Sequence, residues 1–99
     1  MEEQITRVKA GSAVQVTDET RDTDDDLFTP DGGVTYDVID EDGTVVVDGE
    51  TMAESSTGIW ADTFQSAESW MLGMYTVIAY AVHGGKTSIK ENKNAFELY

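Results

Sequence analysis

The chain has 99 residues, which is enough for one domain and too few for two. It has no cysteine, so neither a disulfide nor a thiolate metal site supports the fold, and 39% hydrophobic residues argue against a disordered chain. Twenty Asp and Glu against six Lys and Arg give a net charge of −14, which argues against a protein that binds nucleic acid through a basic surface.

The acidic residues are spread along the chain instead of being gathered in one tail. At low ionic strength such a charge repels itself and destabilises the compact state. In 1 M salt the Debye length falls to about 3 Å, and the repulsion is screened. This distribution resembles that of proteins from halophilic archaea and their viruses, so we expect a protein that works in molar salt; an ordinary acidic mesophilic protein is the alternative.

The chain begins MEEQITRVKAG, which is acidic and has no apolar stretch, so we expect no secretory signal peptide. The longest mostly apolar run, residues 70–82, is shorter than the ~20 residues that a helix needs to cross a bilayer, and it alternates like a strand. We therefore expect no association with a membrane and synthesis in the cytoplasm.

Apolar stretches alternate with Gly- and Asp-rich turns about every ten residues, a spacing typical of a β-sandwich or barrel. We predict strands over residues 4–8 and 12–20, a solvated acidic loop over 22–26, and strands over 34–40 and 44–48. The turn Asp-Glu-Asp-Gly between the last two strands is a strong hairpin signal, because glycine adopts a positive φ without steric penalty. Asp48-Gly49 predicts a further turn, followed by a short strand over 51–54.

In the second half, a turn at residues 56–58 leads to a predicted strand over 59–64, and only 65–72 are compatible with a short helical turn. The longest predicted strand, 74–82, has Tyr75 and Val77 on one face and Met74, Tyr80 and Val82 on the other. Apolar residues on both faces indicate a central strand that is buried on both sides or lies under a partner.

A Gly84-Gly85 turn joins this strand to one over 87–90, and residues 95–99 add the last. Because either glycine of that turn can take the left-handed conformation, we expect Gly84→Ala to cost less stability than Gly43→Val. The pattern as a whole predicts an all-β, immunoglobulin-like antiparallel β-sandwich of seven or eight short strands, forming a single domain over residues 1–99.

His83 is the only histidine, and it stands in the Gly-Gly turn. A catalytic imidazole needs an orienting carboxylate and a nucleophile within hydrogen-bond reach, and no strained Gly-x-Ser-x-Gly turn presents a serine. We therefore interpret His83 as a turn residue and expect no enzyme, no catalytic residue and no cofactor.

The alternate aspartates of residues 22–26 have the spacing that opens an EF-hand loop. A leucine, however, stands where the sharp-turn glycine is required, and a glycine stands in place of the bidentate glutamate. We expect a solvated loop without a metal; a looser calcium site formed by Asp22, Asp24 and Asp31 is the alternative.

Two aromatic residues are candidates for special roles. Tyr75 follows Gly73 at the start of the long strand, where sandwich domains often place a tyrosine whose hydroxyl bonds the backbone at the strand corner. A plain core tyrosine is the alternative. Trp60 is expected in the core, and Trp70 is expected to be a surface anchor, because tryptophan is enriched at the energetic centres of interfaces.

Taken in order, KAGSAVQV, TPDGGVTYDVIDEDGTVVVDGETM, STGIWADTF, GMYTVIAYAVHGGKTS and FELY resemble a family of short immunoglobulin-like structural proteins encoded among the head and tail genes of tailed viruses. The resemblance covers nearly the whole chain and implies no catalytic residue. With the acidic composition, it implies a virion structural protein of a tailed virus that infects a halophilic archaeon, assembled in the host cytoplasm. The role we expect is a ring-forming component of the head–tail neck, such as a connector or stopper subunit.

Two alternatives are an immunoglobulin-like decoration protein of the capsid and a module of a haloarchaeal cell-surface or adhesin protein. The expected partners are other virion proteins, including copies of the chain in a ring, with no sequence-specific nucleic acid. Residues 1–10 and 95–99 are expected to be extended arms or edge strands that reach a neighbour. The side chains expected at an interface are Trp70, Met71, Leu72, Met74, Tyr80, Phe96 and Tyr99.

Overall fold

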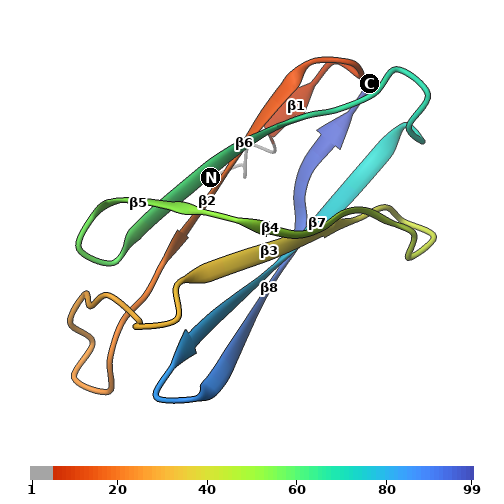
Figure 1. Cartoon of the computed structure of the whole chain (residues 1–99). Helices are drawn as coiled ribbons and strands as arrows, with labels where there is room; N and C mark the ends of the chain where they lie inside the picture. Colours follow the sequence, from red (N-terminus) through yellow and green to blue (C-terminus); the bar gives the residue numbers. More distant parts are fainter. Residues whose placement is uncertain (1–5) are drawn as a thin grey trace, which may run out of the picture.

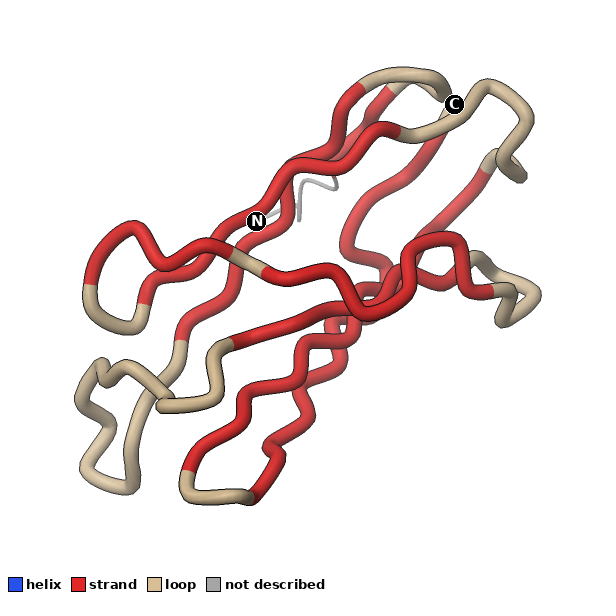
Figure 2. Tube along the Cα trace, viewed as in Figure 1, coloured by secondary structure: helices blue, strands red, loops and turns tan. Residues whose placement is uncertain are grey.

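The computed structural model of the chain describes residues 6–99, which form eight β-strands and no helix (Figures 1 and 2). The strands are β1 (Thr6–Val8), β2 (Ala13–Glu19), β3 (Val34–Ile39), β4 (Val45–Thr51), β5 (Ala53–Ser56), β6 (Ile59–Gln65), β7 (Gly73–His83) and β8 (Lys86–Leu98). Most of the strands are joined by short turns, whereas longer loops over residues 20–33 and 66–72 join β2 to β3 and β6 to β7.

The strands form two sheets packed as a sandwich, which confirms the all-β, two-sheet prediction. The larger sheet has the order β1-β8-β7-β3-β4, and the smaller one has the order β2-β6-β5. All pairings are antiparallel except that of β1 with β8, which is parallel. The chain changes sheet between β4 and β5 at Met52, which is 2% exposed and donates its backbone N–H to the carbonyl of Val34. In Figure 1 the yellow-green chain runs from β4 directly into β5 and so passes from the larger sheet to the smaller one.

The core forms where the alternating apolar residues of both sheets face one another. In β3, Val34, Tyr36 and Val38 are completely buried while the residues between them are partly exposed, so the predicted shared face is confirmed. Trp60 of β6 is also in the core, as expected, and its indole N–H donates to the Thr20 hydroxyl at 3.1 Å. The other buried apolar residues are Val14, Val16, Val47, Met52, Tyr75, Val77, Ala79, Phe96 and Leu98.

Tyr75 fixes the loop between β6 and β7. Its ring is 1% exposed and its hydroxyl donates a 2.7 Å hydrogen bond to the backbone carbonyl of Met71, four residues earlier. This is the corner arrangement that the sequence suggested for a tyrosine at this strand start. Within residues 65–72 the structure has a single hydrogen-bonded turn, from the Trp70 N–H to the Ala67 carbonyl, instead of a helix.

The predicted hairpin at residues 40–43 joins β3 to β4 and is held by one carboxylate. Asp40 accepts backbone N–H groups of Asp42 and Thr44 on the same oxygen, both at 2.9 Å. Gly43 completes the turn with a φ of 84°, which only glycine adopts without strain. Asp40 is 9% exposed, so these two bonds lie partly away from water.

We expect Asp40→Ala to lower the free energy of unfolding by about 2 kcal/mol, because two backbone donors lose a charged acceptor. Asp42→Ala, two residues further along the same turn, is the matched control and is expected to change the free energy of unfolding by less than about 0.5 kcal/mol. Asp40→Asn keeps an oxygen acceptor and should recover about half of the loss. Urea unfolding in molar salt measures all three; equal effects of the two alanine variants would contradict this role of Asp40.

Two turn signals proved to be bulges inside strands. Asp48-Gly49 was predicted to end a strand, but β4 continues to Thr51 with Gly49 at a φ of 67° and a register shift opposite β3. The Gly49 N–H donates to the Asp37 carboxylate at 2.7 Å, so β3 holds the bulge in place. The prediction of a turn there was wrong.

The expected separation of residues 87–90 from 95–99 was also wrong. Both belong to β8, which continues through a bulge with Asn94 at a φ of 55°. At the preceding turn, Gly84 and Gly85 have φ values of 61° and 74°. Both are therefore left-handed, as a two-residue hairpin of this type requires, and neither relieves strain on the other.

The ends of the described chain pair with one another. β1 aligns with Phe96–Leu98, and beyond it the Tyr99 N–H bonds the Val8 carbonyl while the Ala10 N–H bonds the Tyr99 carbonyl. The expected arm over 1–10 therefore includes an edge strand at residues 6–8, whereas residues 1–5 of that prediction lie outside the described residues. The expected C-terminal segment, residues 95–99, lies next to this edge strand on the side toward the centre of the sheet.

Candidate interaction surfaces

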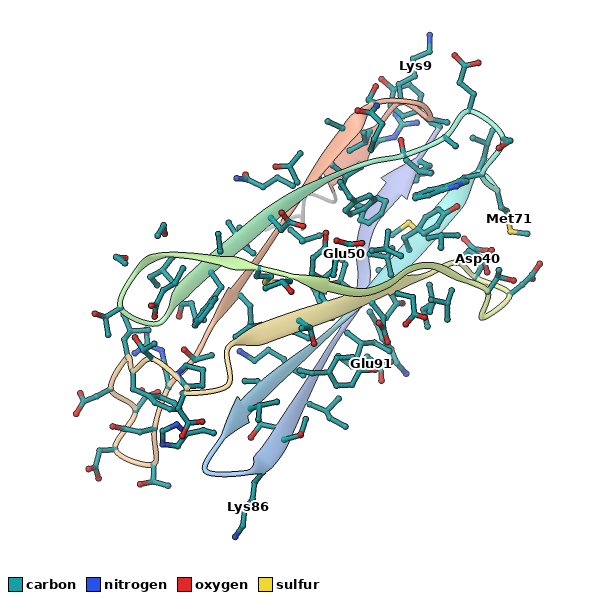
Figure 3. All side chains as sticks on the ribbon, in the orientation of Figure 1. Lys9, Asp40, Glu50, Met71, Lys86 and Glu91 are labelled. Atoms are coloured by element: carbon teal, nitrogen blue, oxygen red, sulfur yellow. The ribbon has the colours of Figure 1, made fainter. Side chains whose placement is uncertain are left out.

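One end of the sandwich carries three exposed large apolar side chains, Met71, Leu72 and Tyr99, which we call the end patch. Their exposed fractions are 43%, 60% and 51%. The pairing of Gly73 with Leu98 brings the next residues outward, Leu72 and Tyr99, side by side. The Arg7 guanidinium lies 4.6 Å from the centre of the Tyr99 ring, and Figure 3 shows Met71 pointing away from the ribbon.

The backbone that carries Met71 and Leu72 adjoins a stack of aromatic rings, since the Tyr75 hydroxyl bonds the Met71 carbonyl. Trp70 stacks on Tyr75 at 6.1 Å and on Phe64 at 6.0 Å, and Tyr75 stacks on Phe96 at 5.1 Å with ring planes 5° apart. Trp70 is therefore half-buried against the core instead of standing out from the surface. Phe96 is 3% exposed and belongs to the core, because it lies opposite Tyr75 in the β7–β8 register.

A second apolar surface is the outer face of the larger sheet, formed by the side chains that point away from the smaller sheet. Tyr80 lies on it opposite Tyr75, and Met74 shares that face, as the alternation of β7 predicts. Both are half-buried. Val45 on β4 and Ile89 on β8 complete this face with exposed fractions of 50% and 67%. Val45 and Ile89 were not predicted from the sequence, because their exposure depends on which strands lie at the edges of the sheet.

Three tyrosine hydroxyls, those of Tyr36, Tyr75 and Tyr80, donate hydrogen bonds, and the pKa of each is raised above the usual value for a phenol. Burial raises the pKa of Tyr36 strongly, and its 2.7 Å bond to Asp62 raises it further. Burial, followed by the charge of Asp40, raises the pKa of Tyr75. The 3.0 Å bond to Asp37 is the main cause of the raised pKa of Tyr80. A phenol with a raised folded-state pKa stabilises the fold below its unfolded pKa of about 10, and that stabilisation is lost as the pH rises above this value.

The acidic loop after β2 is organised by its own side chains. Asp22 accepts the N–H groups of Asp24 and Asp26 on one carboxylate oxygen, at 2.9 and 3.0 Å. Asp31 does not bond within this loop; its carboxylate accepts the N–H of Gly84 in the β7–β8 hairpin at 3.2 Å. Within residues 6–99 the structure does not bring three acidic or histidine side chains together as a metal site, so Asp22, Asp24 and Asp31 form no such cluster.

His83 links the β7–β8 hairpin to the loop that precedes β3. Its Nδ1 atom accepts the N–H of Asp31 at 3.1 Å, and its ring meets Phe28 edge to face with centres 5.2 Å apart. The side chain thus holds two loops together.

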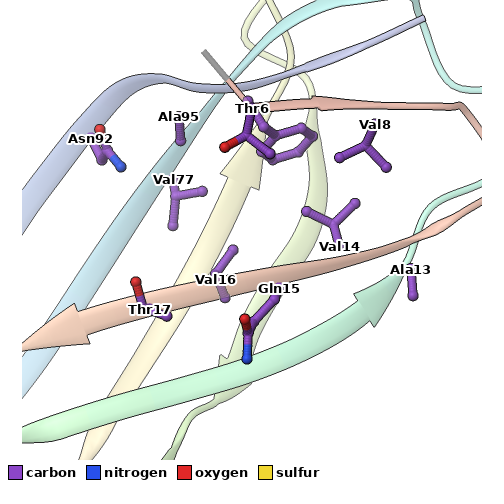
Figure 4. Close-up of a pocket in the computed structure, with 11 residues that line it drawn as sticks. Thr6, Val8, Ala13, Val14, Gln15, Val16, Thr17, Val77, Asn92 and Ala95 are labelled. Carbon is purple, nitrogen blue, oxygen red and sulfur yellow. The ribbon is translucent and has the colours of Figure 1, made fainter. Parts of the chain in front are cut away.

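Hollows in the described surface include one beside the smaller sheet and one beside the acidic loop. One of about 370 Å³ opens between β1 and β2, and Figure 4 shows Val14 and Val16 on the side that faces Val77. No titratable side chain is among the described residues that line it. The other, of about 590 Å³, lies between the acidic loop and the β7–β8 hairpin, where it is bordered by Arg21 and Lys86. The Arg21 guanidinium is already paired with Glu19 at 3.1 Å.

In the described part of the chain there is no helix with the length and hydropathy needed to span a membrane. Comparison with known proteins found no match to this chain among family models, curated proteins or solved structures.

Proposed function

We propose that the chain is a non-catalytic structural subunit with an immunoglobulin-like fold, which forms a ring in the head–tail neck of a tailed virus that infects a halophilic archaeon. The strand order supports the fold assignment. In immunoglobulin-type sandwiches one sheet contains strands B, E and D, and the other contains G, F and C, with C′ beside C in the variable type. The orders β2-β6-β5 and β8-β7-β3-β4 reproduce these sequences of neighbours, and Tyr75 occupies the corner at the start of the F-like strand.

The end patch is the observation that carries the proposal of a contact role. In a chain with a net charge of −14, three large apolar side chains are exposed to water at the same end of the sandwich. The stacking of Trp70 on Tyr75 and of Tyr75 on Phe96 fixes the backbone next to the end patch in the free protein, before a partner binds. Exposed apolar side chains on a rigid base are typical of a protein–protein contact surface, and such a surface binds a partner without a large ordering cost.

The charge suits a neck subunit. The DNA backbone is held to proteins mainly by basic side chains, and a ring whose channel is lined by carboxylates offers none. DNA therefore slides through such a channel without binding. The acidic loop over residues 22–26, with four aspartates, is the densest group of carboxylates in the chain.

The assembled state tests this proposal. The protein is purified in about 3 M KCl, where the repulsion between subunits is screened, and examined by sedimentation and electron cryomicroscopy. We expect rings of six- or twelve-fold symmetry in which Leu72 and Tyr99 are buried. Leu72→Asp should abolish the rings without changing the thermal midpoint, whereas Leu27→Asp, at an exposed leucine outside the end patch, should leave them intact. Clusters of threefold or fivefold symmetry would instead favour capsid decoration, and a monomer under all conditions would contradict the proposal.

A further inference from the structure

The larger sheet has two open edges of opposite character, and the first is the N-terminal half of β8. β1 pairs only with Phe96–Leu98, so residues 86–92 have β7 on one side and no described strand on the other. The N–H and C=O of Val82 bond Gly33 and Gly32, which shows that they point toward β3. Thr87 lies opposite Val82, so its own backbone groups point the other way, to the open edge, and Ile89 follows by alternation.

This first edge is apolar at its centre and basic at its ends. The Ile89 side chain is 67% exposed on the outer face of the sheet. Residues 86–93 carry Lys86, Lys90 and Lys93 against Glu91, a local charge of +2 (3 − 1) in a chain whose net charge is −14. Lys90 is paired with Asp18 at 3.0 Å, while the Lys93 side chain is 79% exposed.

The second edge is the start of β4, at the opposite side of the same sheet. The carbonyl of Thr44 accepts the N–H of Asp40, so the next amide, that of Val45, points away from β3 and into the open edge. Val45 pairs with Ile39 and is 50% exposed on the outer face, the same face that carries Ile89. Residues 41–50 contain Glu41, Asp42, Asp48 and Glu50 and no basic residue, a local charge of −4.

We infer that the β8 edge of one copy pairs with the β4 edge of the next copy, so that the larger sheets continue from subunit to subunit with Ile89 beside Val45. This inference rests on the proposed function, since it names a contact between copies in the ring in addition to the one at the end patch. Within the described residues, both edges present unpaired backbone donors and acceptors. Each also carries one exposed aliphatic side chain on the outer face of the sheet, Ile89 on β8 and Val45 on β4. Their local charges have opposite sign. Unpaired edges of this kind are the usual sites at which strands of separate chains join.

Charge selects this pairing over the symmetric ones. Two β8 edges would bring six lysines together, and two β4 edges would bring eight carboxylates together, by doubling the counts above. In molar salt the Debye length is about 3 Å, so only charges in direct contact matter, and backbone hydrogen bonds and the apolar pair supply most of the affinity. The bulge at Gly49 limits regular pairing to the first half of β4. Because the contact joins unlike surfaces, its repetition closes a ring or propagates a filament.

Proline substitution tests the backbone contact. The Ile89 N–H points to the open edge, so Ile89→Pro removes a donor from the contact without removing a bond to β7. The matched control is Gln15→Pro in β2, an edge strand of the smaller sheet. There the Thr20 N–H bonds the Gly58 carbonyl toward β6, so Gln15 points outward by alternation. We expect Ile89→Pro to weaken assembly at least about tenfold at an unchanged thermal midpoint, and Gln15→Pro to leave it unchanged.

Amide hydrogen exchange of the wild-type assembly separates the outcomes. Slow exchange at Thr87, Ile89 and Val45 together supports the inference. Rings in which these amides exchange as fast as in the monomer, with Ile89→Pro still assembling, overturn the edge contact and leave the proposed function standing. Protection at Ile89 without protection at Val45 means symmetric pairing of two β8 edges, or pairing with another protein, and also overturns it. A wild-type protein that never assembles contradicts both.

Discussion

Raising the KCl concentration from about 0.1 M to about 3 M is expected to raise the thermal midpoint of the isolated protein by about 15 °C. Even with each basic side chain paired to one carboxylate, fourteen of the twenty acidic residues remain without a cationic partner (20 − 6). Their mutual repulsion is present in the compact state and weaker in the expanded one. A gain of about 3 kcal/mol on screening corresponds to this shift for a domain of this size.

A charge-reduced variant shows whether screening is the cause. Substituting Asp24, Asp25 and Asp26 by Asn lowers the net charge from −14 to −11 and leaves the Asp22 carboxylate in its hydrogen bonds to the loop. Its midpoint should rise less with KCl than that of the wild type. Circular dichroism melts follow both proteins, and equal midpoints of the wild type at the two salt concentrations would remove the inference of adaptation to molar salt.

Gly58→Ala is expected to lower the free energy of unfolding by about 4 kcal/mol. Gly58 has a φ of 75°, and an added Cβ would lie 2.9 Å from the Thr20 carbonyl oxygen and from the Leu27 Cβ, and 3.0 Å from the Phe28 nitrogen. Two of these three neighbours are backbone atoms of a segment bonded to the same turn, since the Thr20 N–H donates to the Gly58 carbonyl. Neither moves without breaking that contact.

Gly43→Ala is the matched control. Gly43 has a φ of 84°, but nothing lies within 4 Å of an added Cβ, so only the backbone strain remains and the expected cost is about 1 kcal/mol. Urea unfolding in molar salt measures the difference. Similar costs at the two positions would mean that the loop after β2 yields to the methyl group and does not pack firmly on the β5–β6 turn.

Alternation within strands was predictable from the sequence, because the period of two belongs to the strand itself. Val34, Tyr36 and Val38 on one face, and the separation of Tyr75 from Tyr80, required no knowledge of the neighbouring strands. The errors arose where a local turn signal competed with pairing to a neighbour. Gly49 and Asn94 take the left-handed conformation that turns use, yet β3 and β7 continue to pair beyond them, so each became a bulge.

The interaction surfaces were only partly predictable. Met71 and Leu72 could be placed outside the core because they precede a strand in a loop. Phe96 was misplaced because its burial depends on contact with Tyr75 across the register of two distant segments. Within residues 6–99, β1 pairs only with Phe96–Leu98, so Ile89 lies outside the part of β8 that the described strand covers. Information of this kind resides in strand order and is not visible in local composition.

The parallel pairing of β1 with β8 determines how the domain responds to traction. Because the two strands run in the same direction and belong to opposite ends of the described chain, a force that pulls the chain before β1 away from the chain after β8 slides one strand along the other. The hydrogen bonds between them are then loaded together in shear, whereas an antiparallel hairpin pulled at its open end separates one bond at a time. Resistance to extension is set by the rate of this unfolding step and not by the equilibrium stability. If the β1–β8 pair breaks first, the domain therefore resists a force along the chain until the hydrogen bonds of that pair break in a single step.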